Sequence, residues 1–215
     1  MRWVRQGIWL LIMGLLAGAL HAAPLTRARA IQALGQAEAA VRLAGVDRLA
    51  EIGRGRDADR VAVLLADPDP QVREAAQTAM WLIWSRSGDP AIDALFIDGV
   101  AQMQAGALDD ALATFDGIVR RKPAFAEGWN KRATVLFMLG RNEESLRDCG
   151  EVFKRNRHHF GALSGAGQIH MRLGNWQQAL EFFQRALQVN PNLVGLEPVI
   201  TMLERRLRDR ARQSV

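Results

Sequence analysis

The stretch "GNWQQALEFFQRALQVNP", residues 174–191, decides the fold of this chain. Ala179, Phe183 and Ala186 recur in it at the spacing that places side chains on one face of an α-helix. The stretch ends in Asn-Pro, and proline stops a helix because it lacks the backbone N–H and its ring clashes with the preceding turn. The sequence therefore predicts an amphipathic helix, and the question is whether it is isolated or repeated.

The same pattern occurs three times at a spacing of 34 residues, without insertions. Glycine ends the first helix of each predicted unit, because it adopts a left-handed backbone conformation at little cost. Small residues recur where the two helices of a unit must approach closely. Cys149 takes a position that is otherwise Phe, so we expect it to be a buried core residue. The aligned positions are Leu95, Trp129 and Leu163; Gly99, Ala133 and Gly167; Gly106, Gly140 and Gly174; Ala111, Ser145 and Ala179; Phe115, Cys149 and Phe183; and Pro123, Arg157 and Pro191.

At these residues the chain resembles the tetratricopeptide repeat family. The units fall at about 92–125, 126–159 and 160–193 within a segment 89–193. The resemblance implies an all-α fold, a right-handed α-solenoid of stacked helix pairs. Residues 194–215 resemble the extra helix that caps such arrays. Its predicted apolar stripe is Leu196, Val199, Ile200, Leu203 and Leu207, and its solvent face carries Arg205, Arg206, Arg208, Arg210 and Arg212.

Upstream, residues 24–88 contain a second, weaker repetition. The segments "AVRLAGVDRLA" (40–50) and "DPDPQVREAAQTAMW" (67–81) share a Val-Arg step at a spacing of 31 residues, and Asp69 or Pro70 is expected to start the second helix. Here the chain resembles short bacterial HEAT-like repeats, which are also stacked helix pairs. The aligned pairs are Val41 and Val72, Arg42 and Arg73, Ala44 and Ala75, and Leu49 and Met80.

The two arrays are expected to form one continuous right-handed stack. Trp81 and Trp84, with Leu82 and Ile83, would cover the joint between them, and residues 85–90 ("SRSGDP") would be a short turn. No segment alternates with the period of a β-strand, so the prediction is helix throughout.

The charge of the chain does not indicate nucleic-acid binding, and its cysteine content excludes an intramolecular disulfide. The formal net charge is +5 and the calculated pI is about 10.5, but the chain has no Tyr and a single Cys, so a small excess of charge moves the pI far upward. Without Arg2 and Arg5 the net charge is 5 − 2 = +3, too weak to indicate nucleic-acid binding. Cys149 as the only cysteine excludes an intramolecular disulfide.

The first 22 residues have the three parts of a secretory signal. Arg2 and Arg5 precede an apolar run at 8–20, and "ALHA" supplies small residues before a cleavage point after Ala22. We therefore expect an exported, periplasmic bacterial protein. Retention of the segment as an uncleaved inner-membrane anchor remains an alternative, and only then would the chain contact a membrane.

The sequence contains no convincing motif for metal binding, phosphate binding or nucleophilic catalysis. His158 and His159 are adjacent and His170 lies twelve residues later, a spacing that offers no further metal ligands. The segment "GALSGAGQIH" (161–170) fits neither a phosphate-binding loop nor a nucleophile elbow. We expect no metal, no cofactor and no enzymatic activity.

The remaining candidate is a surface. In tetratricopeptide arrays the first helix of each pair lines a concave groove that holds a peptide, and the resemblance carries this role to matching positions. The alternative is that Phe96 and Phe137 simply pack between units. The clamp of Lys, Arg and Asn that captures acidic chaperone C-termini in some members is absent, since only Asn130 suits it. The expected groove residues are Phe96, Val100, Met103, Gln104, Glu127, Asn130, Thr134, Phe137, Met138, Ser164, Gln168, Met171 and Arg172.

The sequence thus predicts a non-catalytic scaffold of the cell envelope that binds a peptide segment of another protein. A membrane-anchored structural adaptor is the first alternative. An envelope enzyme is the second, and it lacks clustered carboxylates or a His-based dyad in register.

Overall fold

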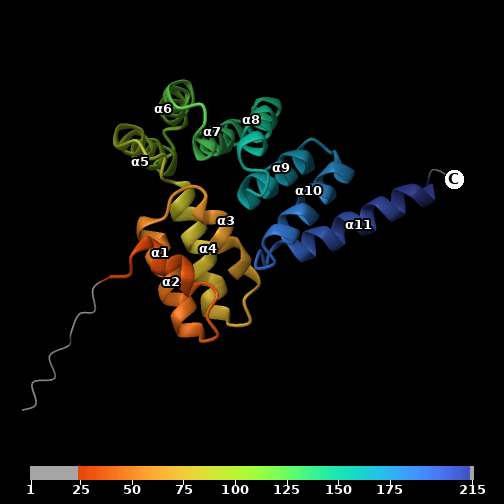
Figure 1. The fold of residues 1–215 in the computed structure, drawn as a ribbon. Coiled ribbons are helices and arrows are strands. Elements are labelled where there is room, and N and C mark those ends of the chain that lie inside the picture. The colour runs from red at the N-terminus through yellow and green to blue at the C-terminus, as the bar shows by residue number, and fades with distance from the viewer. Residues whose placement is uncertain (1–23, 214–215) are drawn as a thin grey trace, which may run out of the picture.

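The structure, a computed structural model, describes residues 24–213, and all regular elements in that range are helical (Figure 1). The predicted signal segment lies outside the described residues. The elements are α1 (Arg27–Ala33), α2 (Ala39–Ile52), α3 (Asp57–Ala62), the 3-10 helix η1 (Val63–Ala66), α4 (Pro70–Trp84), α5 (Pro90–Gln104), α6 (Leu108–Arg121), α7 (Ala126–Met138), α8 (Asn142–Arg155), α9 (Phe160–Arg172), α10 (Trp176–Val189) and α11 (Leu196–Gln213). The predicted all-α solenoid is confirmed.

The helix bounds of the C-terminal array repeat with the period read from the sequence. Helices α6, α8 and α10 begin at residues 108, 142 and 176, and α7 and α9 begin at 126 and 160. Gly106, Gly140 and Gly174 have φ of 77°, 77° and 75°, the left-handed conformation expected after the first helix of each unit. The glycine positions therefore set where each pair turns.

Close packing within a pair depends on the small residues. A Cβ at Gly99 would lie 2.9 Å from the ring of Phe115, and one at Gly167 would lie 2.7 Å from the ring of Phe183. No larger residue fits at either position without moving the aromatic ring on the partner helix. The small-residue columns thus serve helix contact, as predicted.

Asp-Pro steps start two of the longer helices. The Asp69 side chain accepts hydrogen bonds from the backbone N–H groups of Gln71 and Val72, and proline follows it at the first helical position. Asp89 caps α5 in the same way. These caps satisfy N–H groups that have no partner inside the helix.

The N-terminal helices α1 to α4 have a core of their own, which includes Val46, Leu49 and Met80. The matched arginines of the two HEAT-like segments make equivalent hydrogen bonds. Arg42 donates to the carbonyls of residues 36 and 37, and Arg73 to those of residues 67 and 68, six and five residues upstream in each case. Arg42 also forms a buried ion pair with Asp67 at 2.7 Å. The sequence alignment of the two HEAT-like segments therefore corresponds to equivalent hydrogen bonds in the structure.

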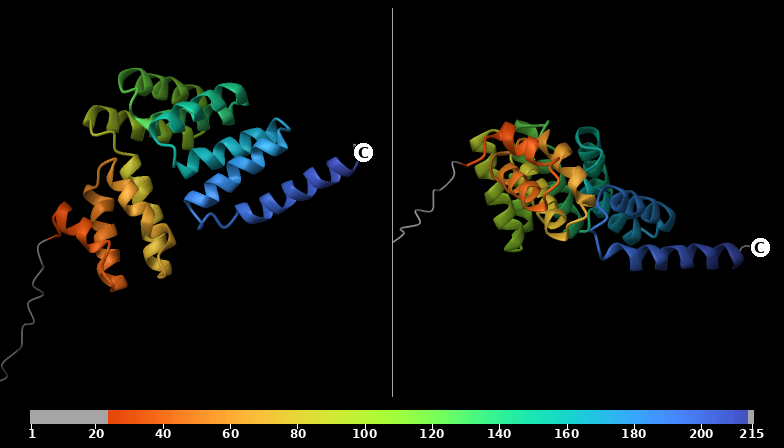
Figure 2. Two further views of the ribbon diagram at one scale, coloured as in Figure 1. Left: turned by 45° about the vertical axis from the view of Figure 1, so that its right-hand side comes forward. Right: turned by 60° about the horizontal axis from the view of Figure 1, so that its bottom comes forward.

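The arrangement of the two arrays differs from the predicted continuous stack. The core around α4 includes Phe160, with Val189 and Leu193 packed against it, and no residue of α5. The Asn190 side chain donates to Gln77 at 2.6 Å, and the Asn192 side chain donates to the carbonyl of Leu65 at 2.7 Å. The array curves so that its third unit returns to α4 (Figures 1 and 2). Trp81 and Trp84 therefore cover this long-range contact and not the α4–α5 joint.

Helix α11 extends the array beyond α10, as Figure 2 shows. Leu203 is fully buried, and Leu196, Val199, Ile200 and Leu207 pack beside it against Leu180 and Phe183. The predicted apolar stripe is confirmed, and it closes the end of the array.

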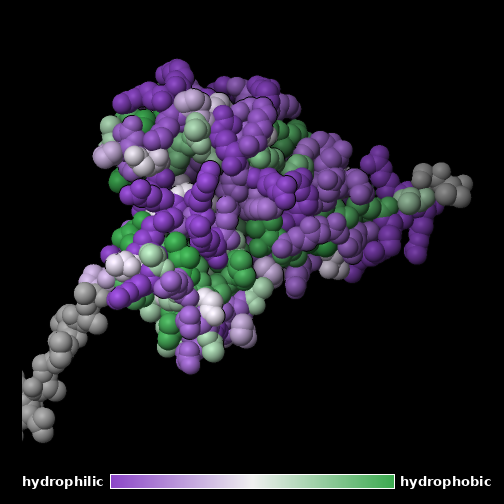
Figure 3. Space-filling model, in the orientation of Figure 1, coloured by the Kyte–Doolittle hydropathy of each residue, from purple (hydrophilic) through white to green (hydrophobic). Residues whose placement is uncertain are grey.

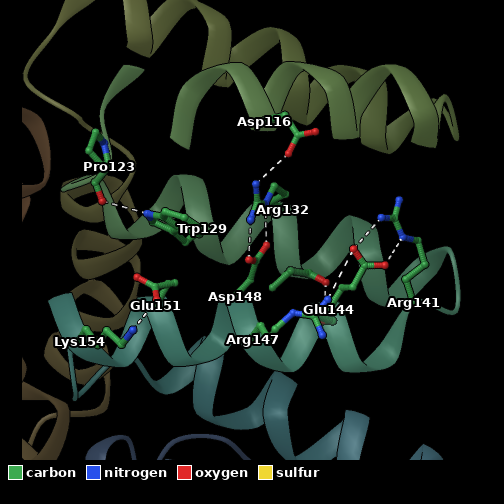
Figure 4. Close-up of polar contacts among 12 residues, drawn as sticks. Asp116, Pro123, Trp129, Arg132, Arg141, Glu144, Arg147, Asp148, Glu151 and Lys154 are labelled. Atoms are coloured by element: carbon green, nitrogen blue, oxygen red, sulfur yellow. Dashed lines mark hydrogen bonds and ion pairs between the residues drawn. The ribbon is translucent and has the colours of Figure 1, made fainter. Parts of the chain in front are cut away.

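A polar network joins α6, α7 and α8 (Figure 4). Arg132 donates two hydrogen bonds to Asp148, at 2.7 and 2.6 Å, and one to Asp116 at 2.8 Å. Its guanidinium also lies 4.8 Å from the centre of the Trp129 ring. A bidentate guanidinium–carboxylate pair fixes both side chains, so this network sets how consecutive units pack.

Candidate peptide-binding groove

The predicted groove residues lie on helices α5, α7 and α9. Among them, Gln104, Met138, Gln168 and Arg172 are exposed, and Met138 is 49% accessible. Those that are half-buried are Val100, Met103, Thr134, Phe137, Ser164 and Met171. Both apolar and polar side chains are thus accessible on these helices, which suits contact with the backbone and the side chains of a peptide.

Arg172 and Phe137 connect α7 and α9 on this face. The guanidinium carbon of Arg172 lies 3.6 Å from the centre of the Phe137 ring, and its Nη1 donates to the carbonyl of Phe137 at 2.7 Å. Beside them lies a small pocket of about 70 Å³ whose lining includes Thr134, Gly165 and Gln168. The pocket is large enough for a small side chain only, since water alone occupies about 30 Å³.

Three of the predicted groove residues are buried. Phe96 packs edge-to-face against Phe115 and Phe125, at ring-centre distances of 6.0 and 5.5 Å. Glu127 and Asn130 are 1% and 7% accessible, and Asn130 donates to both carboxylate oxygens of Glu127. Their neighbours cover these side chains, so they are not available to a bound peptide. The aromatic contacts of Phe96 lie within its own unit, 92–125, and not between units.

Glu127, in the first turn of α7, forms a buried pair with His159, the N-cap residue of α9. The His159 Nδ1 accepts the backbone N–H of Ala162 at 3.1 Å, so its Nε2 carries the proton and donates to Glu127 at 2.7 Å. Burial alone raises the pKa of the Glu127 carboxyl, but the hydrogen bond from His159 and the nearby Lys131 ammonium outweigh it and leave the pKa below its ordinary value. The pair joins α7 to the start of α9.

The N-terminal helices close one end of the groove. Trp84 stacks on His159 at 4.3 Å between ring centres, and Trp81 lies edge-on to Phe160 at 5.0 Å. A Cβ at Gly161 would come within 2.2 Å of the Trp81 ring, and the Lys131 ammonium lies 5.8 Å from the centre of that ring. Trp81 therefore occupies the groove where α7 and α9 begin.

Neither Trp81 nor the Glu127–His159 pair was assigned to this site from the sequence. A glycine at the first turn of α9 was a usable signal for a close neighbour, but nothing local in the sequence indicates that the neighbour comes from α4. The two adjacent histidines differ in environment, since His158 is exposed while His159 is fully buried.

The described residues offer little for covalent or metal chemistry. Within residues 24–213, no three His, Cys, Asp or Glu side chains gather closely enough to hold a metal ion. Cys149 is buried as predicted, and burial raises the pKa of its thiol to about 12. A thiol with such a pKa stays protonated at neutral pH and is a poor nucleophile. In the same range, none of the helices has the length and apolar character that a membrane crossing requires.

Models of known protein families match several parts of the sequence. Two tetratricopeptide repeat models match residues 99–152 and 160–193. A model described as a HEAT repeat associated with sister chromatid cohesion matches residues 64–76 and 186–211. These last two segments are in contact, since the Asn192 side chain donates to the carbonyl of Leu65.

Curated relatives carry the same repeats. A TPR repeat-containing protein of Rhizobium etli is 31% identical over 144 residues, which cover 67% of this chain and 71% of that protein. The human DnaJ homolog subfamily C member 3 is 28% identical over 94 residues, and the match spans 44% of this chain and 19% of that relative.

Solved structures share the fold at lower identity. The first TPR of Spaghetti (RPAP3) bound to the HSP90 peptide SRMEEVD has a TM-score of 0.52 at 21% identity, covering 54% of this chain and 92% of that one. The MamA protein has a TM-score of 0.52 at 18% identity, covering 72% of this chain and 88% of that one. The fold defines a helical-repeat protein with a concave face. The chain belongs to the tetratricopeptide repeat family.

Proposed function

We propose that this protein is a non-catalytic scaffold that binds a peptide segment of a partner protein on the concave face of α5, α7 and α9. The observation that carries the proposal is a strip of accessible side chains in the C-terminal halves of α5, α7 and α9. Met138 is exposed in the last turn of α7, whereas Met103 and Met171, in the last turns of α5 and α9, are half-buried against neighbouring cores. Methionine side chains adapt their shape to varied partners.

Polar groups beside this strip would hold a peptide backbone. Gln168 is exposed, and the Thr134 hydroxyl already donates to the carbonyl of Asn130, which leaves its lone pairs for a backbone N–H. Because Trp81 fills the other end, the peptide would lie across the C-terminal halves of the inner helices. We therefore expect the peptide contacts to come from Val100, Thr134, Phe137, Gln168 and the three methionines.

The test is selection of peptides on the purified full chain from a random library, followed by titration of synthetic copies. The groove variant is Thr134→Phe with Gln168→Phe, in which two large uncharged side chains block the strip sterically. The matched control is Gln177→Phe with Gln184→Phe, two exposed residues of α10. We expect at least tenfold weaker binding to the groove variant and unchanged binding to the control. Failure to enrich any peptide, or equal binding by all three proteins, would refute the proposal.

We further propose that the scaffold works in the bacterial cell envelope, on the basis of the signal-like first 22 residues. A C-terminally tagged full chain expressed in a Gram-negative host tests this. Recovery in the periplasmic fraction without residues 1–22 would support export and cleavage. Full-length protein that stays with membranes after a salt wash would instead support the anchored adaptor. Recovery of full-length protein in the cytoplasm would exclude both.

A further inference from the structure

A second cavity, separate from the concave face, lies between helices α3 and α4 and the turns that join the repeat units. It consists of two pockets of about 790 and 360 Å³, and the linings of both include Trp84, Asp59, Arg155 and Asn156. We refer to the two pockets together as the inter-array cleft. Of the expected groove residues only buried Glu127 lies at its wall, so the cleft is a distinct surface.

Positive charge without carboxylate partners surrounds the cleft. Arg86 donates only to the backbone carbonyls of Ala50 and Gly53, and the Arg157 guanidinium contacts only the ring of His158. Arg56 and Lys122, also at the wall, form no ion pair with any described residue. Unpaired cations around a concavity raise the local concentration of anionic groups.

Opposing charge in the cleft is small. Asp59 is exposed and has no ion-pair partner among residues 24–213, so it remains as one negative charge. The Glu127 carboxylate is buried and held by His159, Asn130 and Lys131. Arg155 is the one cation of the wall that a carboxylate neutralises, through Glu151 at 2.7 Å. The balance of the cleft is therefore cationic.

The cleft also has an apolar wall, which a simple anion would leave unused. Val63 is 75% accessible, although its neighbours Leu64 and Leu65 are buried, and Ala62, Trp84 and Val189 stand beside it half-buried. Figure 3 shows apolar surface gathered over the N-terminal helices and near their junction with the array, while the face over α6 to α8 is mostly hydrophilic. Apolar contacts beside cations suit a chain that carries both carboxylates and apolar side chains.

We propose that the inter-array cleft binds an extended acidic peptide segment of a partner protein. Its carboxylates would lie on Arg56, Lys122 and Arg157, and its apolar side chains on Val63 and Trp84. A nucleic acid fits less well, because one face of Trp84 is already stacked on His159 and the chain carries a net charge of only +5.

The test uses the purified full chain and a fluorescein-labelled peptide of alternating Glu and Leu, read by fluorescence anisotropy. The comparison peptide has Gln in place of every Glu. The cleft variant is Arg56→Glu with Arg157→Glu, two exposed residues whose side chains stabilise no other element. The matched control, Arg29→Glu with Arg120→Glu, makes the same change in charge at exposed positions of α1 and α6.

We expect the Glu peptide to bind at least tenfold more tightly than the Gln peptide, and to weaken as salt rises from 50 to 200 mM. The cleft variant should lose at least tenfold in affinity, while the control changes less than twofold. The groove variant Thr134→Phe with Gln168→Phe should bind the Glu peptide normally, which separates this proposal from that for the concave face.

Three results would overturn the proposal. Equal binding of the Glu and Gln peptides would show that the cations do not select carboxylates. Equal losses of affinity in the cleft variant and the control would show that the net charge of the protein, and not the cleft, determines binding of the Glu peptide. Heparin or a single-stranded oligonucleotide that binds as tightly as the Glu peptide and displaces it would show a surface that recognises charge alone.

Discussion

Replacement of Gly161 by alanine tests the contact that closes the array onto α4. A Cβ at this position lies 2.2 Å from the tip of the Trp81 ring and within 3.2 Å of two further ring atoms. The ring has little freedom to move away, because Trp84, His159 and Phe160 surround it at 5.0–5.6 Å between ring centres. The substitution must therefore displace either the ring or α9.

Gly165 provides the matched control. It lies one turn further along α9, and nothing stands within 4 Å of a Cβ there. Both substitutions gain about 1 kcal/mol from the higher helix propensity of alanine. Overpacking costs about 1–3 kcal/mol at Gly161 only. The difference in unfolding free energy between the two variants should therefore be about 1–3 kcal/mol, with Gly161→Ala the less stable.

Urea unfolding followed by circular dichroism measures this difference. If the clash is with Trp81, the same two substitutions should differ much less in a Trp81→Ala background, since contacting residues are not additive. A Gly161→Ala protein as stable as Gly165→Ala would refute the packing of α4 against α9. A penalty that persists without Trp81 would assign the clash to another neighbour.

Three further substitutions or modifications test the interior of the array. Glu127→Gln should cost about 1–3 kcal/mol at pH 7, because it weakens a buried hydrogen bond between α7 and the N-cap residue of α9. The pKa of Glu127 in the folded protein lies below its ordinary value of 4.5, so the carboxylate stabilises the fold fully above pH 4.5 and loses this effect as the pH falls below it. The difference in unfolding free energy between the parent protein and Glu127→Gln, measured in urea, should therefore shrink on acidification. A difference that stays constant with pH would contradict the assignment. Cys149, with a pKa raised to about 12, should resist a thiol reagent at pH 8 in the native protein and react fully in denaturant, whereas fast native labelling would show that it is accessible. Gly140→Ala should lower stability by about 1–2 kcal/mol in thermal melts, because φ is 77° there, and Gly150→Ala in α8, with open space around it, should not.

Local chemistry explains why the sequence predicted the repeats so well. Three features act on neighbours within one unit: the turn glycines, the small residues at helix contacts and the prolines that end helices. Each of them therefore recurs in the sequence at a fixed spacing. The same holds for α11, whose apolar stripe is set by helical periodicity. The HEAT-like register also follows from short-range contacts, since Arg42 and Arg73 bind carbonyls only five and six residues away.

The candidate site was predictable only in part. Repeat register assigned the groove residues to the first helix of each pair, and they lie on α5, α7 and α9. It could not tell which of those side chains other parts of the array would cover. Phe96 meets Phe115 and Phe125, and Glu127 meets His159, so both are removed from the accessible face.

The sequence by itself therefore determined the helices, their pairing and the period of the array. Only the tertiary structure decided where the array ends up relative to the N-terminal helices. The contacts that fix this join Gln77 to Asn190 and Leu65 to Asn192, residues 113 and 127 positions apart. Such contacts depend on the curvature summed over all the intervening helices, and no local pattern encodes that sum. The closed end of the groove and the inter-array cleft both arise from this closure.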